Sequence, residues 1–170
     1  MQGVECYGKW RKKVTVKIRK LKGEDALKIR ELMHHYDRPI PERAIRLSSS
    51  KGWMCHLAKQ ELSFVAEADG KVVGFVSGNF IPRSAQDSSS LTLTNPGGEI
   101  LVGDLVVHRD YRGKGIATSL LLHVKESGLS KGITKLVGYV DSDNRPALKL
   151  YRKLGFQLKE VGLNLMVFKT

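Results

Sequence analysis

A basic, glycine-rich turn stands in the middle of this chain, between an apolar stretch and a helical pattern. The apolar residues 105–107 precede it, and the turn itself reads Arg112-Gly113-Lys114-Gly115. Glycine lets the backbone turn sharply, and the first N–H groups of a helix have no acceptors within the helix. Together with the helix dipole, these N–H groups form a binding site for a phosphate or pyrophosphate. The segment therefore predicts recognition of a phosphorylated ligand through the backbone.

Two common phosphate-binding patterns fit this turn poorly. A P-loop needs Lys directly after its last glycine, but Ile116 follows Gly115. The dinucleotide fingerprint needs a third glycine where this chain has Thr118, although Asp141 lies near the place of its acidic residue. Dinucleotide binding is therefore disfavoured but still open, and so is a tight strand–helix turn that binds no ligand.

Periodic patterns before the turn predict the first elements that hold it in place. Alternating apolar and polar residues are typical of a strand with one exposed face, and a spacing of three or four is typical of an amphipathic helix. The Ala68-Asp69-Gly70 sequence between two alternating segments predicts a hairpin. The predicted elements are a strand over 14–19, a helix beginning at Ala26, a helix over 42–47, and hairpin strands over 63–67 and 71–78.

The strand that leads into the turn is the most apolar part of the chain. Residues 100–107 are nearly all apolar except Gly103 and Asp104, which is typical of a central strand buried on both faces. The order of all these elements predicts a mixed sheet covered by helices. The elements predicted after the turn are a helix over 114–127 that stops at Gly128, a strand over 136–140, a helix over 146–154, and strands over 156–158 and 163–168.

Two blocks of this sequence resemble one known family. The stretch 108–117, with its Arg112-x-x-Gly115-x-Ala117 pattern, is similar to the acetyl-CoA pyrophosphate loop of the GNAT superfamily of N-acetyltransferases. The stretch 144–156 resembles the family's second cofactor motif, an Asn followed by A-x-x-L-Y-x-x-x-G-F. Residues 18–25 look like its first strand and turn, so the resemblance covers about residues 14–169 in consistent order.

The resemblance implies both a fold and an activity. The fold is an α/β (α+β) domain over residues 14–170, preceded by a basic arm over 1–13. Its mixed, mostly antiparallel sheet has about six to seven strands, is flanked by helices and is splayed at the central strands. The activity is direct transfer of an acetyl group from acetyl-CoA to a primary amine in a ternary complex.

The resemblance also implies which residues hold acetyl-CoA. The strand 105–107 pairs with the pantetheine arm, and a backbone N–H at or near Val106 polarises the thioester carbonyl. Asn144 contacts the pantetheine arm and is also a plausible cap for the helix that follows. The predicted cofactor-binding residues are Leu105, Val106, Val107, Arg112, Gly113, Lys114, Gly115, Ile116, Ala117, Thr118, Asn144 and Tyr151.

Acyl transfer from a thioester to an amine needs a general acid and a general base. Tyr151 is the predicted acid, because a phenol with a pKa near ~10 is protonated at neutral pH; an ordinary core residue is the alternative. Asp104 and Glu99 are the predicted bases, and Glu67 is a third option, each acting directly or through water. Glu99 lies thirteen residues before Arg112, a spacing that resembles histone-type members. Asp104 in an apolar strand must be paired or protonated.

Charge suggests a second partner. The 170 residues hold 29 Lys and Arg against 17 Asp and Glu, a net charge of +12. Eight basic residues and one acid fall within residues 1–22, so this segment alone carries +7. Coenzyme A phosphates do not account for this segment. They do account for the basic residues near the two motifs, which are Arg109, Arg112, Lys114, Arg145, Lys149 and Arg152. A nucleic-acid- or ribosome-associated binding module is therefore the alternative function, and a solvated arm is the simpler explanation.

Composition limits the remaining possibilities. No apolar run approaches the ~18 residues of a membrane span, and residues 1–12 lack the apolar stretch of a signal peptide. The two cysteines make no disulfide framework, and the five histidines show no metal-ligand spacing. We expect a cytoplasmic monomer or homodimer that needs neither metal nor membrane. Its amine acceptor, a small molecule or a protein, is not predicted.

Overall fold

The sheet of this protein is mixed, as the sequence predicts. The computed structural model describes residues 4–6, 14–35, 51–59, 62–81, 98–161 and 163–169. Within them the sheet has eight strands, rather than six or seven, in the order β1-β2-β3-β4-β5-β6-β8-β7. All neighbours are antiparallel except β5 and β6. The strands are β1 (Val4–Cys6), β2 (Val14–Lys20), β3 (Phe64–Ala68), β4 (Lys71–Ile81), β5 (Glu99–Val107), β6 (Lys135–Val140), β7 (Gln157–Val161) and β8 (Leu163–Lys169).

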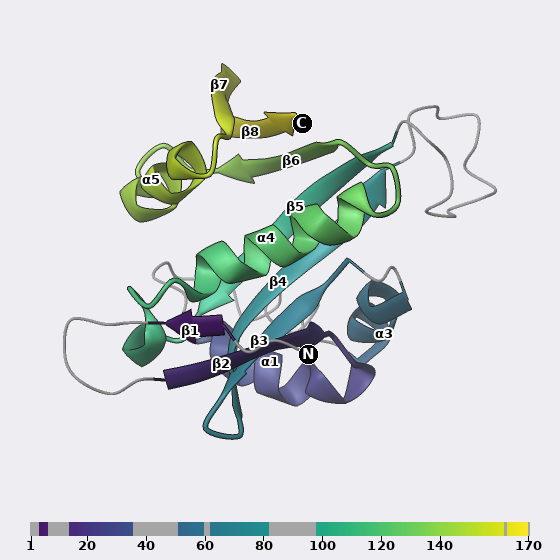
Figure 1. The fold of residues 1–170 in the computed structure, drawn as a ribbon, viewed down its shortest axis with the longest axis vertical. Coiled ribbons are helices and arrows are strands. Elements are labelled where there is room, and N and C mark those ends of the chain that lie inside the picture. Colours follow the sequence, from purple (N-terminus) through teal and green to yellow (C-terminus); the bar gives the residue numbers. More distant parts are fainter. Residues whose placement is uncertain are drawn as a thin grey trace.

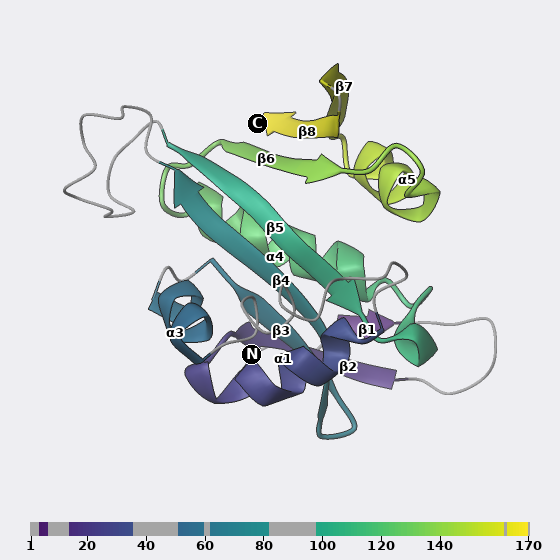
Figure 2. The ribbon, with the colours of Figure 1, turned by 180° about the vertical axis from the view of Figure 1, so that it is seen from behind.

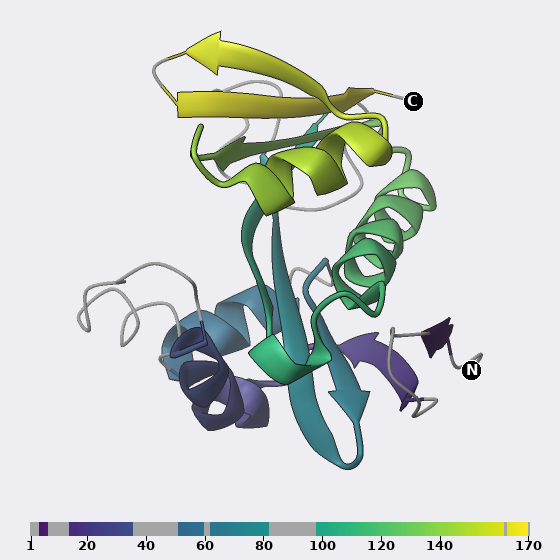
Figure 3. The ribbon, with the colours of Figure 1, turned by 90° about the vertical axis from the view of Figure 1, so that its left-hand side faces the viewer.

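Helices cover both faces of the sheet. Figure 1 shows α4 lying across β4 and β5, and Figure 3 shows α1 and α3 on the opposite side. We call these two sides the α4 face and the α1 face. Figure 2 presents the α1 face. The helices are α1 (Ala26–Met33), α3 (Lys51–Lys59), α4 (Ile116–Leu129) and α5 (Arg145–Lys153), with short 3₁₀ turns η1 (Gly23–Asp25) and η3 (Arg109–Tyr111).

Each face has its own core. On the α4 face, Leu120 and Val124 of α4 belong to one buried cluster with Ile100 of β5. On the α1 face, Ile29 of α1 belongs to a second cluster with Val106 of β5. Strand β5 therefore contributes to both cores, which places it at the centre of the molecule.

The first strand lies inside the segment predicted to be a basic arm. Val4–Cys6 pairs antiparallel with residues 14–16 of β2, so this part of the arm extends the edge of the sheet. All the basic residues of the arm, and the helix predicted over 42–47, lie outside the described residues. In the part of the chain that the structure describes, no helix is long and apolar enough to cross a membrane.

Gly128 does not end the helix that follows the glycine turn, contrary to the prediction. The helix continues to Leu129, and the chain reverses at Gly132, whose φ is +74°. A Cβ at Gly128 would lie 2.4 Å from Cδ1 of Ile100. Gly128 is therefore explained by the close approach of α4 to the sheet, and Gly132 provides the left-handed residue that ends the helix.

A β-bulge interrupts β5 in its middle. Val76 and Gly78 of β4 pair with Leu105 and Val102, so two residues of β5 lie opposite the single residue Ser77. The backbone N–H of Asp104 donates to Oγ of Ser77 at 2.8 Å. A Cβ at Gly103 would lie 2.6 Å from the same oxygen, so any other residue there would have to displace the Ser77 hydroxyl. A bulge bends its strand, and here it precedes the end of β5 that leads to the glycine turn.

Beyond the bulge, β5 separates from its parallel neighbour. Pairing between β5 and β6 runs from Glu99–Lys135 to Val102–Gly138 and stops there. Residues 103–107 thus leave the edge of β5 that faces β6 without a paired strand among the described residues. This confirms the predicted splay of the central strands.

A buried ion pair fixes the start of α1 against the sheet. The guanidinium of Arg19 donates to both carboxylate oxygens of Asp25 at 2.7 Å and to Oε1 of Glu67 at 2.7 Å. The N–H of Lys22 donates to Asp25 at 2.9 Å. Burial alone would raise the pKa of Asp25, but Arg19 and this N–H outweigh it and hold that pKa below its usual value. Asp25 is therefore ionised in the folded protein at neutral pH.

We expect Asp25→Asn to lower the free energy of unfolding by about 2–3 kcal/mol at pH 7, because the variant removes the fully buried one of the two carboxylates that Arg19 contacts. A folded-state pKa below the unfolded value means that the carboxylate stabilises the fold above about pH 4 and loses this effect as pH falls further. Urea titrations at pH 7 and pH 3.5 should show the difference shrink. Glu24→Gln is the control, because Glu24 is exposed and 3.5 Å from Lys22; an equal loss there would contradict the prediction.

Candidate active site

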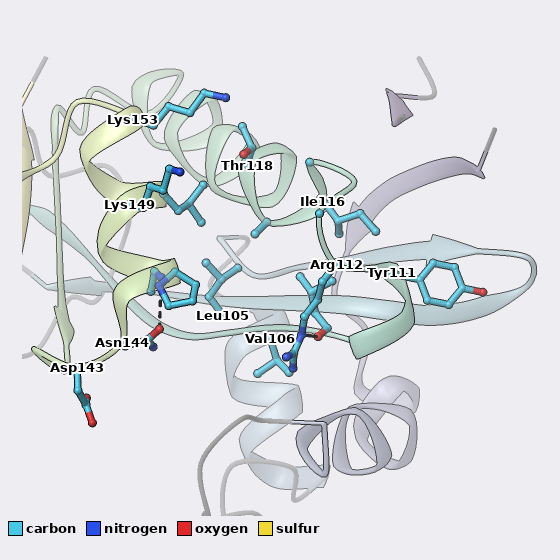
Figure 4. Close-up of a pocket in the computed structure, with 17 residues that line it drawn as sticks. Leu105, Val106, Tyr111, Arg112, Ile116, Thr118, Asp143, Asn144, Lys149 and Lys153 are labelled. Carbon is cyan, nitrogen blue, oxygen red and sulfur yellow. Dashed lines mark hydrogen bonds between the residues drawn. The ribbon is translucent and has the colours of Figure 1, made fainter. Parts of the chain in front are cut away.

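A groove of about 810 Å³ lies between the splayed end of β5, the start of α4, and α5 (Figure 4). Its floor is formed by β5, and Leu105 lies between the two helices in this view. The elements that line it are the two sequence blocks and the strand before them, so the structure brings these together. The lining residues are Leu105, Val106, Val107, Tyr111, Arg112, Gly113, Gly115, Ile116, Ala117, Thr118, Asp143, Asn144, Pro146, Ala147, Lys149, Leu150 and Lys153.

The glycine turn aims unpaired N–H groups into this groove. Gly113 and Gly115 have φ of +72° and +80°, a left-handed conformation that costs other residues about 1–2 kcal/mol. The first backbone bond within α4 runs from the N–H of Ser119 to the carbonyl of Gly115 at 3.0 Å. The N–H groups of residues 116–118 therefore have no acceptor in the helix. This is the donor set that a pyrophosphate requires, so the site fits coenzyme A.

Two lysines of α5 supply positive charge on the wall of the groove opposite the start of α4. Lys149 and Lys153 are four residues apart on the same face of α5, and both line the groove (Figure 4). Sequence reasoning singled out Lys149 but not Lys153. The spacing of four, which places two side chains on one helical face, was the signal that could have found Lys153.

The guanidinium of Arg112 binds backbone carbonyls of this protein and so connects the glycine turn to other elements. Its Nε donates to the carbonyl of Val107 at 3.0 Å, and its Nη2 donates to the carbonyl of His35. Figure 4 shows its side chain directed away from α4. The ring of His35 also lies 3.8 Å from that of His108, centroid to centroid. Arg112 and this ring contact thus join the end of α1 to the glycine turn.

Lys114 also holds the turn, and it does not line the groove. Its Nζ donates to the carbonyl of Asp110 at 3.1 Å and lies 4.8 Å from the centroid of the Tyr111 ring. The hydroxyl of Tyr111 donates to Asp69 at 3.2 Å. Arg112 and Lys114, which the sequence predicts to bind the cofactor, thus both make contacts that hold the shape of the turn.

Asp104 occupies the bulge, at the point where β5 leaves β6. Phe75, two residues before Ser77 on β4, and Val106, two residues after Asp104 on β5, both belong to the core of the α1 face. Alternation therefore places Ser77 and Asp104 on that face as well. Burial raises the pKa of Asp104. A carboxylate with a raised pKa is a stronger base than one in water. Asp104 is only half-buried, so this carboxyl group keeps partial access to solvent although it lies in an apolar strand, a point that the sequence left open.

The other two candidate bases are committed to ion pairs. Glu99 begins β5 and pairs with Nζ of Lys135. Neither Glu99 nor Asp104 is among the residues that line the groove, but Asp104 directly precedes Leu105, which lines it. Glu99 is five residues further back, which is about 16 Å along a strand. Glu67 accepts from Arg19, and this contact lowers the pKa of Glu67. The structure therefore gives both residues structural partners and separates them from the groove.

Tyr151 lies beneath the groove wall rather than in its lining. It is 5% exposed, and its ring meets that of Phe156 edge-on at 5.4 Å between centroids. Its neighbours on α5, Ala147 and Leu150, face the groove. The predicted capping role of Asn144 is clear, because its side chain accepts from the N–H of Ala147 at 3.3 Å.

Similar proteins of known structure share this fold. PaiA N-acetyltransferase from Thermoplasma acidophilum, solved with coenzyme A, superposes with a TM-score of 0.72 at 23% identity, over 91% of this chain and 99% of that one. The protein yncA from Salmonella typhimurium, solved with its cofactor acetyl-CoA, gives 0.69 at 21% identity, over 91% and 93%.

Sequence relatives and a family match identify the group. Mycothiol acetyltransferase of Thermobifida fusca is 36% identical over 56% of this chain and 28% of its own length. An uncharacterized N-acetyltransferase of Methanocaldococcus jannaschii is 32% identical over 58% and 40%. This chain thus spans less than half of either relative. Residues 27–156 match the acetyltransferase (GNAT) family. The chain therefore belongs to the GNAT family of acetyltransferases.

Proposed function

We propose that this protein transfers the acetyl group of acetyl-CoA to a primary amine within a ternary complex. One observation carries the proposal: the groove joins a row of unpaired helix N–H groups to a strand edge that a bulge has separated from its neighbour. The first suits a pyrophosphate, and the second suits an extended chain with amide groups. Acetyl-CoA has both parts, and its thioester supplies the acetyl group.

The residues that hold the donor divide into three sets. The N–H groups of 116–118 bind the pyrophosphate. The free edge of 105–107 pairs with the pantetheine arm as an added strand does, and a backbone N–H there polarises the thioester carbonyl. Lys149 and Lys153 lie on the opposite wall, where their charges attract the phosphates.

Proton transfer is assigned to Asp104 and Tyr151. An amine with a pKa near ~10 arrives as an ammonium ion and must lose a proton before its nitrogen can attack. Asp104 takes this proton, directly or through water. As the C–N bond forms, the C–S bond breaks and its electron pair goes to sulfur. Tyr151 gives its proton to this thiolate and regains one from solvent. The second proton lost by the nitrogen passes to solvent, and so does the first, once Asp104 releases it.

We expect acetyl-CoA at a hundredfold excess over Kd to stabilise the fold by about 2.7 kcal/mol, which raises Tm by about 5–10 °C. Gly115→Ala should bind it about tenfold more weakly, because the strain of the left-handed residue moves the turn. Gly132→Ala is the matched control: its φ is +74°, it lies outside the groove, and a Cβ there would also meet open space. Equal losses of Tm shift in both variants would argue against the turn as the phosphate site.

Activity is measured as thiol release from acetyl-CoA in the presence of a panel of amines and peptides. Release that depends on both substrates, with a mass gain of one acetyl group on the amine, supports the proposal. If acetyl-CoA gave the expected Tm shift but no amine were acetylated, the protein would bind coenzyme A without catalysing the proposed reaction, and the proposal would be wrong.

A further inference from the structure

Strand β6, which lies beside the unpaired edge of β5, carries an aromatic side chain that the proposed reaction does not use. Tyr139 of β6 is 63% exposed, unusually open for a large aromatic residue on an interior strand. Leu136 and Val140 of the same strand belong to the core of the α4 face. Because neighbouring positions on a strand point to opposite faces, Tyr139 points to the α1 face.

Tyr139 and Asp104 both lie just beyond the point where the pairing of β5 with β6 ends. The last pair that joins β5 to β6 is Val102–Gly138. Tyr139 is one residue beyond this pair on β6, and Asp104 is two residues beyond it on β5. Both lie on the α1 face, on opposite sides of the opening between β6 and the unpaired edge of β5. We call this opening the mouth. In Figure 2, neither α1 nor α3 lies in front of β6, and both cover the strands further down.

The surroundings of this mouth combine one charge with an apolar surface. Glu99, the other carboxylate that β5 places on the α1 face, is neutralised by Lys135. Val137 lies two residues before Tyr139 on the same face, and Leu101 is half-buried on β5. Among the described residues of β5 and β6, Asp104 is therefore the one carboxylate here without a cationic partner.

We propose that this mouth, formed by Asp104, Tyr139 and Leu101, selects a primary amine carried by an apolar and preferably aromatic body. The inference rests on the proposed acetyl transfer and names its acceptor class. The ammonium group faces Asp104, and the body stacks against the ring of Tyr139. A polyamine would bring a second positive charge, but the other carboxylate that β5 places on this face, Glu99, is already paired with Lys135, and the net charge of the chain is +12. Polyamines are therefore poor acceptors.

Two kinds of molecule have this chemistry: a free arylalkylamine and the α-amine of a peptide with an aromatic first residue. The test compares phenethylamine, a tetrapeptide that begins with Phe, the same peptide beginning with Gly, and spermidine. Each is assayed with the wild-type protein, Tyr139→Ser, Tyr139→Phe and Leu122→Ser. Leu122 is 38% exposed on α4 and serves as the control for loss of an exposed apolar side chain elsewhere.

We expect Tyr139→Ser to raise KM for the aromatic amines about tenfold or more, while kcat and the Tm shift with acetyl-CoA stay within about twofold. Tyr139→Phe should retain the wild-type KM, because the ring provides the contact. Leu122→Ser should match the wild type. A preference for either phenethylamine or the Phe peptide supports the proposal. The better of the two shows whether the acceptor is a free arylalkylamine or the α-amine of a peptide.

The inference is overturned if spermidine or the Gly peptide is the better wild-type substrate, or if Tyr139→Ser affects all four acceptors equally. Both results still show acetyl transfer, so the proposed function would survive them. Absence of acetyl transfer to any of a broad set of amines would instead overturn the proposed function, and this acceptor class with it.

Discussion

Asp104→Asn is expected to lower kcat/KM for the amine by about 10²- to 10³-fold, the contribution of a general base. The amide is nearly the same size and keeps the backbone bond to Ser77, but it cannot take a proton. Burial raises the pKa of Asp104 in the folded protein, so its ionised form opposes folding at neutral pH. The variant should therefore be at least as stable as the wild type above pH 5, and its lost activity cannot be ascribed to unfolding.

The pH profile distinguishes a base from a merely structural carboxyl group. In the wild type, kcat/KM should fall on the acid side as Asp104 becomes protonated, at a pH above the ordinary value of about 3.9. Asp104→Asn should lack this limb. Glu99→Gln is the control, because Glu99 is paired with Lys135, and it should keep both the limb and a rate within about twofold. If Glu99→Gln were the slow variant, the base would have been assigned to the wrong end of β5.

Tyr151→Phe should reduce kcat by about 10²-fold and leave KM for acetyl-CoA within about threefold. The hydroxyl is the only group removed, and the ring can keep its edge contact with Phe156. Tm should therefore change by only a few degrees. Because Tyr151 lies under the groove wall, the experiment separates two roles: a core residue would change Tm and spare kcat, whereas a proton donor does the reverse. Unchanged turnover would remove Tyr151 from the mechanism.

The features that the sequence predicted well depend on neighbours along the chain. The left-handed conformation of Gly115 and the cap from Asn144 to Ala147 involve only a few residues each. Their chemistry is local, so the order of residue types is sufficient to find them. The strands with clear alternation were found for the same reason.

The features that the sequence did not predict depend on residues far apart. Whether Glu99 or Asp104 is available as a base depends on Lys135, which is 36 residues from Glu99. The direction of the Arg112 side chain depends on His35, 77 residues away. Gly128 looked like a helix end because a local pattern cannot distinguish that role from close contact with Ile100.

The bulge opposite Ser77 also changes the phase of the strand. Ile100 and Val102 have even numbers and Leu105 and Val107 have odd numbers, yet all four associate with the same core cluster. The extra residue in between makes this possible, since strict alternation would send the second pair to the other side. Leu105 and Val107 therefore pack against the same core as Ile100 and Val102 and also line the groove. Because these two side chains are only partly buried, substitutions there can alter ligand preference at a smaller cost in packing than substitutions of the fully buried Ile100.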